Sequence, residues 1–169
     1  GDVYKRQTLY NCKMVQAQDG VSVESDTLGA LLYPLEGDTF ALDMVIKPER
    51  YHEFGIALHV DKELETGYFL RMNPKNQLVA WDMWPRGEQG RYQWQIKGDV
   101  PYQIETARKL PKAEEYRVHI IKEKDICVVY INDEIVLSTR MYNHKDGYAG
   151  IYVVRGNVKL IQYKEKRSE

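Results

Sequence analysis

The stretch EEYRVHIIKEKDICVVYINDEIVLSTRMY, residues 114–142, contains three apolar segments separated by two short polar turns. β-branched and aromatic residues dominate these segments, and such residues suit the pleated, half-buried surface of a strand. Residues 122–125, Lys-Glu-Lys-Asp, form the first expected turn. Asn132 and Asp133 form the second, because Asn and Asp tolerate the left-handed backbone that tight hairpins need. The stretch therefore predicts three consecutive antiparallel strands.

The same pattern of short strands covers most of the chain. Apolar and polar residues alternate from Phe40 to Pro48, which predicts a strand with one face in a core. No segment shows ten residues of convincing helical period. Further expected elements are strands over residues 53–61, 66–73 and 77–84, a hairpin turned at Asp19-Gly20, and a last hairpin within residues 147–163 turned at Arg155-Gly156-Asn157.

Many short strands with regularly spaced turns are typical of a sandwich or a barrel. The count of roughly twelve strands favours two stacked sheets of about six, each with one face in the core and one toward water. We therefore expect an all-β fold, a two-sheet antiparallel β-sandwich of the concanavalin-like jelly-roll class.

Composition limits the partners of the chain. Its 169 residues suit one domain, and 43% hydrophobic with 29% charged residues is ordinary for a globular protein. A formal net charge of -1 argues against nucleic acid as the main partner, and no apolar run is long enough to cross a membrane. Only Cys12 and Cys127 are present, which leaves room for one disulfide and favours a reducing compartment such as the cytoplasm.

Residues 1–7, GDVYKRQ, have no hydrophobic period and no turn chemistry. Residues 2–7 fit the codons of a transposon end used in sequencing libraries, and Gly1 resembles a protease scar. We expect residues 1–7 to be non-native and residues 8–169 to form a single β-sandwich domain. On this interpretation the gene is truncated and the protein continues upstream. The alternative is that residues 2–7 are a genuine strand or tail.

A search for catalytic chemistry finds no nucleophile elbow, phosphate loop or metal-ligand spacing of Cys and His in the sequence. His59 and His119 lie in predicted strands, where a hydrogen-bonded or surface role is expected. The carboxylates of this search are expected to be solvated acids, because sequence alone brings no two of them together. They are Asp43, Asp61, Asp82, Asp99 and Glu105. No catalytic residue, metal site or cofactor is predicted.

Residues 80–102, AWDMWPRGEQGRYQWQIKGDVPY, contain all three tryptophans. Aromatic faces stack on sugar rings, and arginine bonds hydroxyls in pairs, so we single out Trp84, Arg86, Tyr92 and Trp94 as carbohydrate-binding candidates. Because Trp81 and Trp84 have opposite parity in one strand, at most one of them faces the core. Packing against a neighbouring domain and packing within this domain are the alternatives.

The three-strand stretch and its continuation resemble the C-terminal β-sandwich of glycoside hydrolase family 32, the invertases, levanases and fructanases. The matching residues are Val129, Tyr130, Ile131, Asn132, Asp133, Ser138, Thr139, Arg140, Met141, Tyr142, Gly150 and Ile151. The tryptophan-rich stretch is also similar to the middle of bacterial versions, except that Met83 follows Asp82 where those versions often have arginine. The resemblance covers residues 40–163.

The resemblance implies a non-catalytic accessory module. Catalysis in that family belongs to an N-terminal five-bladed propeller, whose Asn-Asp-Pro-Asn, Arg-Asp-Pro and Glu-Cys motifs are absent from this sequence. The expected partner is therefore the catalytic propeller of a truncated fructan- or sucrose-type enzyme. A free-standing, lectin-like carbohydrate-binding domain is the alternative. A small glycosidase is a third, for which residues 61–65 (DKELE) are the nearest approach to paired acids.

Overall fold

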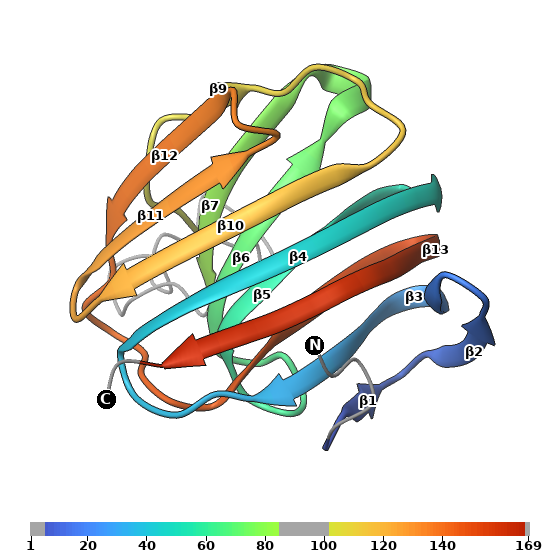
Figure 1. The fold of residues 1–169 in the computed structure, drawn as a ribbon, viewed down its shortest axis with the longest axis horizontal. Coiled ribbons are helices and arrows are strands. Elements are labelled where there is room, and N and C mark those ends of the chain that lie inside the picture. Colours follow the sequence, from blue (N-terminus) through green and yellow to red (C-terminus); the bar gives the residue numbers. More distant parts are fainter. Residues whose placement is uncertain (1–5, 85–101, 168–169) are drawn as a thin grey trace, which may run out of the picture.

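The computed structural model describes residues 6–84 and 102–167, and most of them lie in strands (Figure 1). The strands are β1 (Thr8–Tyr10), β2 (Lys13–Ala17), β3 (Gly20–Pro34), β4 (Thr39–Arg50), β5 (Glu53–Val60), β6 (Gly67–Asn73), β7 (Leu78–Trp84), β8 (Tyr102–Gln103), β9 (Arg108–Lys109), β10 (Tyr116–Glu123), β11 (Ile126–Ile131), β12 (Ile135–Arg140) and β13 (Tyr148–Arg167). One 3-10 turn, η1 (Pro74–Asn76), joins β6 to β7. In these ranges no helix is long and apolar enough to span a membrane.

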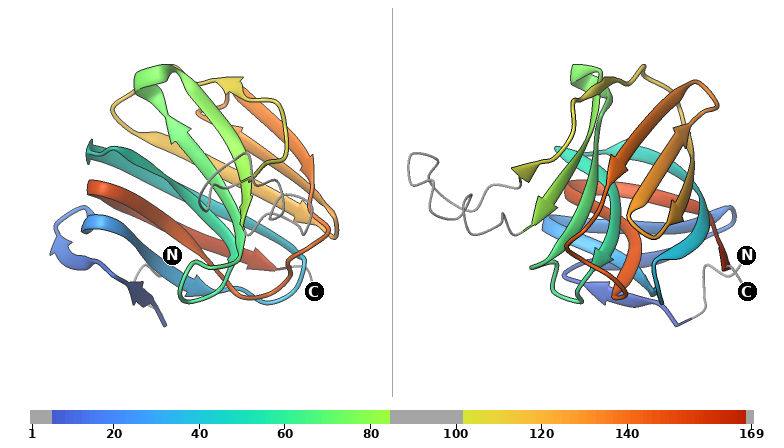
Figure 2. Two further views of the ribbon diagram at one scale, coloured as in Figure 1. Left: turned by 180° about the vertical axis from the view of Figure 1, so that it is seen from behind. Right: turned by 90° about the vertical axis from the view of Figure 1, so that its left-hand side faces the viewer.

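The antiparallel strands form two stacked layers, which the views of Figure 2 show from behind and from the side. The first layer has the order β12-β11-β10-β4-β13-β3-β2, and the second has the order β1-β3-β13-β5-β6-β7-β8. β3 and β13 belong to both layers. Residues 148–154 of β13 pair with β5, and residues 157–167 pair with β4. The predicted two-sheet β-sandwich is confirmed.

The stretch that predicted three strands forms β10, β11 and β12 in antiparallel register. Lys124 in the first turn has a φ of 56°, and Asn132 and Asp133 in the second have φ of 51° and 56°. The left-handed backbone expected at Asn132 and Asp133 is therefore present. The hairpin turned at Asp19-Gly20 is also present, as β2 and β3.

The predicted hairpin at Arg155-Gly156-Asn157 is wrong, because β13 runs through these residues as one strand. The pairing of β13 with β3 shifts register between Val154 and Gly156, and Arg155 has a φ of 49°. This β-bulge bends the strand from one layer into the other. A Cβ at Gly156 would lie 2.7 Å from Tyr51 Cα, so the bend requires glycine. β13 has neighbours on both sides, and a turn would break both ladders.

Two apolar clusters lie on the two faces of the second layer. The main core fills the space between the layers, and the second cluster lies on the outer face of the second layer. Trp81 is fully buried in the main core, whereas Trp84 packs half-buried against the second cluster. The predicted opposite orientation of these two tryptophans is thus confirmed. Residues of the second cluster are Ala30, Leu32, Ala57, Val60, Leu64, Phe69 and Tyr152.

Candidate functional site

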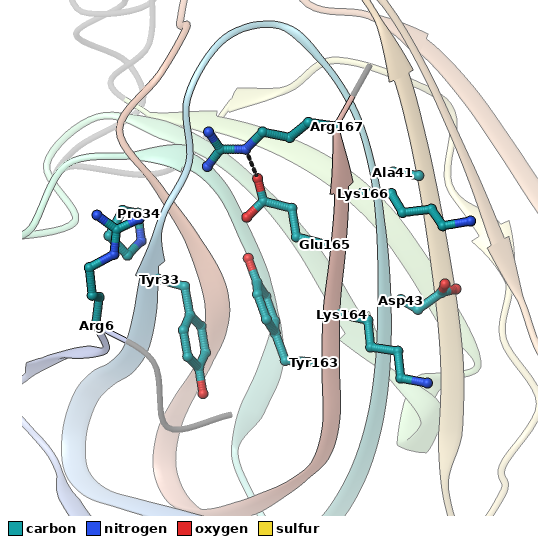
Figure 3. Close-up of a pocket in the computed structure, with 10 residues that line it drawn as sticks. All are labelled: Arg6, Tyr33, Pro34, Ala41, Asp43, Tyr163, Lys164, Glu165, Lys166 and Arg167. Atoms are coloured by element: carbon teal, nitrogen blue, oxygen red, sulfur yellow. Dashed lines mark hydrogen bonds and ion pairs between the residues drawn. The ribbon is translucent and has the colours of Figure 1, made fainter. Parts of the chain in front are cut away.

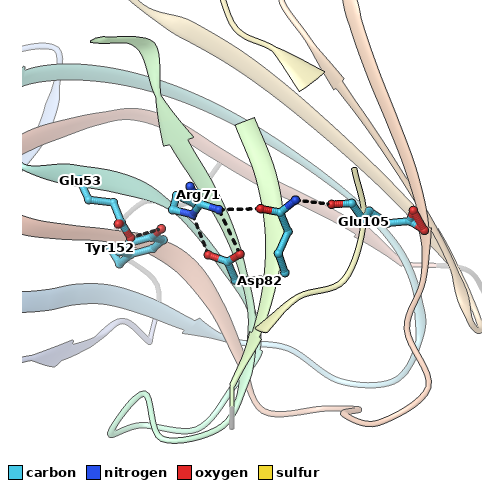
Figure 4. Close-up of polar contacts among 6 residues, drawn as sticks. Glu53, Arg71, Asp82, Glu105 and Tyr152 are labelled. Carbon is cyan, nitrogen blue, oxygen red and sulfur yellow. Dashed lines mark hydrogen bonds and ion pairs between the residues drawn. The ribbon is translucent and has the colours of Figure 1, made fainter. Parts of the chain in front are cut away.

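A row of polar side chains crosses the outer face of the second layer (Figure 4). It begins with Tyr152 on β13 and Glu53 on β5, continues with Arg71 on β6 and Asp82 on β7, and ends at Gln103 on β8. The register explains the alignment, because the residue opposite both Tyr152 and Arg71 is Gly55 of β5. Alternation along each strand then sends these side chains to one face. We call these five residues the polar row.

Arg71 and Asp82 form the centre of the polar row. Arg71 Nε lies 2.8 Å from Asp82 Oδ2, and Nη2 lies 3.4 Å from Oδ1, which is the paired geometry of guanidinium and carboxylate. Nη2 also donates to Gln103 Oε1 at 3.0 Å, and Gln103 Nε2 donates to the Glu105 carbonyl at 2.9 Å. The Asp82 carboxylate raises the pKa of Arg71. The guanidinium is therefore charged and held from two sides.

Glu53 and Tyr152 form the other end. The Tyr152 hydroxyl donates to Glu53 Oε2 at 2.9 Å, and its ring is buried edge-on against Phe69 with centroids 5.5 Å apart. A Cβ at Gly55 would lie 2.9 Å from the Tyr152 ring, so glycine leaves the space in which this ring lies. Burial raises the pKa of Glu53 and raises that of Tyr152 well above its usual value. The carboxylate is thus held by a rigid aromatic partner.

Aromatic side chains border the polar row. Phe69 lies opposite Asp82 in the β6–β7 ladder, and Trp84 is on the same face two residues after Asp82. Tyr148 and Trp84 are half-buried and pack against the second apolar cluster. The face therefore combines charged groups with partly exposed aromatic surface, which is the usual composition of a small-ligand site.

Two polar atoms of the polar row can form further hydrogen bonds. Among the described residues, Glu53 Oε1 and Arg71 Nη1 form no hydrogen bond. One is an acceptor and the other a donor, on neighbouring strands and on the same face of the layer. A ligand that offers several hydroxyls, with an apolar ring face beside them, matches this combination.

The sequence-predicted site residues have different outcomes. Trp84 borders the polar row, while Arg86, Tyr92 and Trp94 lie outside the described residues. Met83 points into the main core, so the arginine that the resemblance leads one to expect beside Asp82 comes instead from Arg71 of the neighbouring strand.

The expectation that the carboxylates are solvated acids is wrong for Asp82, which is only 5% exposed. Burial is tolerated because Arg71 neutralises the charge. Asp43 is half-buried beside His119, and Asp61 accepts the backbone N–H groups of Glu65 and Thr66 in the turn after β5. Glu105 is exposed as expected, and Asp99 lies outside the described residues.

Sequence reasoning missed Glu53, Arg71, Gln103 and Tyr152. Arg71 carried a usable signal, because it is the one charged residue in the otherwise apolar strand GYFLRMN, residues 67–73. A charge there needs a partner on its own face. The other three residues are recognisable only once the strand register is known.

A hollow of about 670 Å³ lies elsewhere, beside the stacked rings of Tyr33 and Tyr163, whose centroids are 4.1 Å apart (Figure 3). Arg167 on its rim already pairs with Glu165 at 2.6 Å and with Glu36 at 2.9 Å. The Tyr163 hydroxyl has no partner among the described residues, but it is buried from solvent. Besides these groups, the hollow is lined by charged side chains such as the exposed Lys164 and Lys166. It is the weaker candidate, because its aromatic hydroxyl is buried and Arg167 is already paired.

A third polar cluster lies inside the sandwich. Lys122 Nζ lies 2.9 Å from His59 Nε2, and His59 Nδ1 lies 2.8 Å from the carbonyl oxygen of Asp146. Because a carbonyl only accepts, Nδ1 carries the hydrogen and Nε2 accepts from Lys122. Burial lowers the pKa of His59 to about 4 and also lowers that of Lys122. Both side chains are almost fully buried, so no ligand reaches them. The prediction that His59 is hydrogen-bonded is confirmed.

The cysteines and potential metal ligands add no further site. Cys12 and Cys127 are free thiols, and burial raises the pKa of Cys127 to about 12. Within residues 6–84 and 102–167, no group of three or more His, Cys, Asp or Glu is placed to hold a metal ion. The polar row is therefore the site with the best-developed chemistry in the described part of the chain.

Comparison with known proteins supports the fold. No protein-family model matches the sequence, and no curated protein matches it significantly. Among solved structures, a carbohydrate binding module, CBM66 from Bacillus subtilis, is similar with a TM-score of 0.77 at 17% identity, over 95% of each chain. A putative glycosyl hydrolase from Parabacteroides distasonis has a TM-score of 0.64 at 15% identity, over 98% of this chain and 90% of that one.

The exoplasmic/lumenal domain of VIP36, in its Ca2+/Man3GlcNAc-bound form, is also similar, with a TM-score of 0.62 at 12% identity. That likeness covers 97% of this chain and 84% of the VIP36 chain. At these identities each likeness shows a common fold. The chain is therefore a two-sheet antiparallel β-sandwich, a fold that it has in common with these three proteins.

Proposed function

We propose that this protein is a carbohydrate-binding β-sandwich whose ligand lies on the polar row. The carrying observation is that Arg71, held by Asp82 and Gln103, and Glu53, held by Tyr152, lie on one face of the second layer, and that each keeps a polar atom with no hydrogen bond to the described residues. Paired donors and acceptors beside aromatic rings suit the vicinal hydroxyls and apolar faces of sugars. Trp84 is the proposed stacking residue. A similar fold in a carbohydrate binding module and in a mannose-oligosaccharide-bound domain supports the proposal.

The finer proposal is that residues 8–169 are the non-catalytic accessory module of a truncated fructan- or sucrose-type glycoside hydrolase, beside a catalytic propeller. The family 32 resemblance over residues 40–163 supports it, as does the similar fold in a putative glycosyl hydrolase. The alternative is a free-standing carbohydrate-binding domain.

Titration with levan, inulin, xylan and β-glucan, followed by calorimetry and tryptophan fluorescence, tests carbohydrate binding. We expect at least one polymer to bind at millimolar concentration or below. Arg71→Met removes a charged hydrogen-bond donor and is expected to weaken binding about tenfold or more. Arg117→Met, an exposed arginine on the first layer, is the matched control and is expected to bind as the wild type does. The proposal is contradicted if none of the four polymers binds, or if Arg71→Met binds as tightly as the wild type.

The accessory role has its own tests. Incubation of the purified chain with the same polymers is expected to release no reducing sugar, and steady release of fructose contradicts it. The gene is then resequenced across its start, from a library made without transposon ends. An open reading frame running upstream into a propeller supports the accessory module, whereas a start codon just before Thr8 favours the free-standing domain.

A further inference from the structure

The charges on the polar row do not balance. Three ionisable groups come from three adjacent strands, and they are Glu53, Arg71 and Asp82. Arg71 forms an ion pair with Asp82, and the side-chain exposures of 25% and 7% show that the pair is largely shielded from water. The guanidinium charge is therefore already matched by one carboxylate, and the other carboxylate, Glu53, remains.

Glu53 has no counter-charge in contact. Among the described residues it forms no ion pair, and its single side-chain hydrogen bond comes from the neutral hydroxyl of Tyr152. On this face it lies beside Gly55 and the buried Tyr152 ring, which offer no further donor. It also lies beside Arg71, whose guanidinium makes no hydrogen bond to it and is paired with Asp82. The charges of Arg71 and Asp82 act on Glu53 with opposite sign. Such surroundings screen the negative charge of Glu53 poorly, so a ligand bound at the polar row experiences its electrostatic field.

The remaining capacity of Glu53 is an acceptor. Oε1 accepts a hydrogen bond, and every sugar hydroxyl can donate one. A carboxylate or sulfate on a ligand cannot donate, and it would bring a second negative charge beside a poorly screened one. The free nitrogen of Arg71 does not reverse this balance, because Asp82 holds the same guanidinium at 2.8 Å.

We infer that the polar row takes uncharged polyhydroxylated glycans and that Glu53 is the specificity residue that excludes acidic ones, such as uronate-containing or sulfated polymers. This inference rests on the proposed carbohydrate-binding function. Glu53 then does more than accept a hydrogen bond, because its negative charge distinguishes neutral glycans from acidic ones.

The test measures, in low salt, the affinity of the protein for levan, inulin and xylan. Each affinity is compared with that for the lightly carboxymethylated form of the same polymer. The wild type is expected to bind a neutral polymer at least about tenfold more tightly than its carboxymethylated form. Glu53→Gln keeps the shape and an acceptor oxygen but removes the charge. It is expected to narrow this ratio to about threefold or less while still binding the neutral polymer.

One control variant and three distinct outcomes separate the possible results. Glu49→Gln removes an exposed carboxylate at the end of β4 and is expected to leave the ratio unchanged. If no neutral polymer binds, the proposed function fails and the inference fails with it. If neutral polymers bind but the wild type binds the carboxymethylated forms equally well, only the inference fails. If Glu53→Gln keeps the full ratio, the exclusion belongs to another group and the role of Glu53 is overturned.

Discussion

The polar row and the buried pair of His59 and Lys122 are opposite solutions to placing charge in a β-sandwich. The polar row lies on the outer face of the second layer. There Arg71 and Asp82 form an ion pair, whereas Glu53 is hydrogen-bonded to the neutral Tyr152 hydroxyl. The interior pair joins two bases at 2.9 Å, and in the described part of the chain no carboxylate forms an ion pair with Lys122. One cluster keeps free polar atoms for a ligand, and the other does not.

The difference shows how surroundings decide protonation. Asp82 and Arg71 can both remain charged because each stabilises the other. His59 can only be neutral, because its Nδ1 hydrogen goes to the Asp146 carbonyl and its Nε2 accepts from Lys122. A proton on Nε2 would face the amine with no acceptor between them. The interior cluster is therefore expected to respond to acid, and the polar row to the loss of a partner.

The largest expected effect is acid destabilisation through His59. Its pKa of about 4 in the folded chain lies below the ordinary value of 6.5. The unfolded chain therefore binds more protons between these values, so stability is complete above about pH 6.5 and falls as the pH drops toward 4. The difference corresponds to about 3 kcal/mol. Urea unfolding at several pH values measures it.

Two variants isolate the His59 contribution. His59→Gln cannot take up the proton and is expected to lose about 3 kcal/mol less than the wild type between pH 7 and 4. His52→Gln removes an exposed histidine whose side chain forms no hydrogen bond in the described residues, so it should follow the wild-type curve. Parallel curves for His59→Gln and the wild type would contradict the assigned protonation state.

Breaking the ion pair of the polar row is the next largest effect. Asp82→Ala leaves the largely buried Arg71 guanidinium without a counter-charge. This loss is expected to cost about 2 kcal/mol of unfolding free energy, because Arg71 still reaches some water and keeps its hydrogen bond to Gln103. The double variant Arg71→Met/Asp82→Leu replaces the pair with apolar volume and should recover at least half of that loss. Asp43→Ala, which removes a half-exposed hydrogen bond to His119, should cost less than about 1 kcal/mol. If Asp82→Ala and Asp43→Ala lost equal unfolding free energy, burial of the Arg71–Asp82 pair would not be what makes it more important to stability.

Replacing the interior amine is expected to have a smaller effect. Lys122→Met keeps the length of the side chain but removes the buried amine, while His59 Nε2 loses its donor. The two effects oppose each other, so the unfolding free energy at pH 8 should stay within about 1 kcal/mol of the wild type. A loss above 2 kcal/mol would show that the Lys122 amine stabilises the fold. The interior cluster would then depend on its charged group for stability, as the polar row does.

Sequence patterns predicted the layers of this molecule better than its site. Alternation in β4 and the turn residues Asn132 and Asp133 are local signals, and they correctly indicate strands and a tight turn. Arg155-Gly156-Asn157 has the same turn chemistry but forms a bulge, because the partners of β13 on both sides come from distant parts of the chain. Local sequence contains no information about those partners.

The site depends on distant partners throughout. Asp82 stood out only as a member of the tryptophan-rich stretch, and its partner Arg71 lies on the preceding strand. Glu53 and Tyr152 are 99 residues apart in sequence and meet because β5 pairs with β13. Trp84 could be singled out as a candidate from the sequence because an aromatic residue is recognisable in any register, whereas a row of single polar residues on five strands is recognisable only when the register is known.

The smallest expected effect distinguishes the two clusters by sign. Burial raises the pKa of Glu53, so the folded chain holds its proton to higher pH than the unfolded chain does. Through this group stability falls as pH rises across the interval from the ordinary carboxyl value to the raised one, which is the opposite of the His59 effect. Glu53→Gln should therefore make the acid loss of stability slightly steeper than in the wild type, whereas His59→Gln makes it shallower. Urea titrations of both variants from pH 7 to 4 measure the two slopes. A shallower slope for Glu53→Gln would mean that Glu53 is stabilised as a carboxylate, which requires a cation that faces it and would remove the basis for excluding acidic glycans.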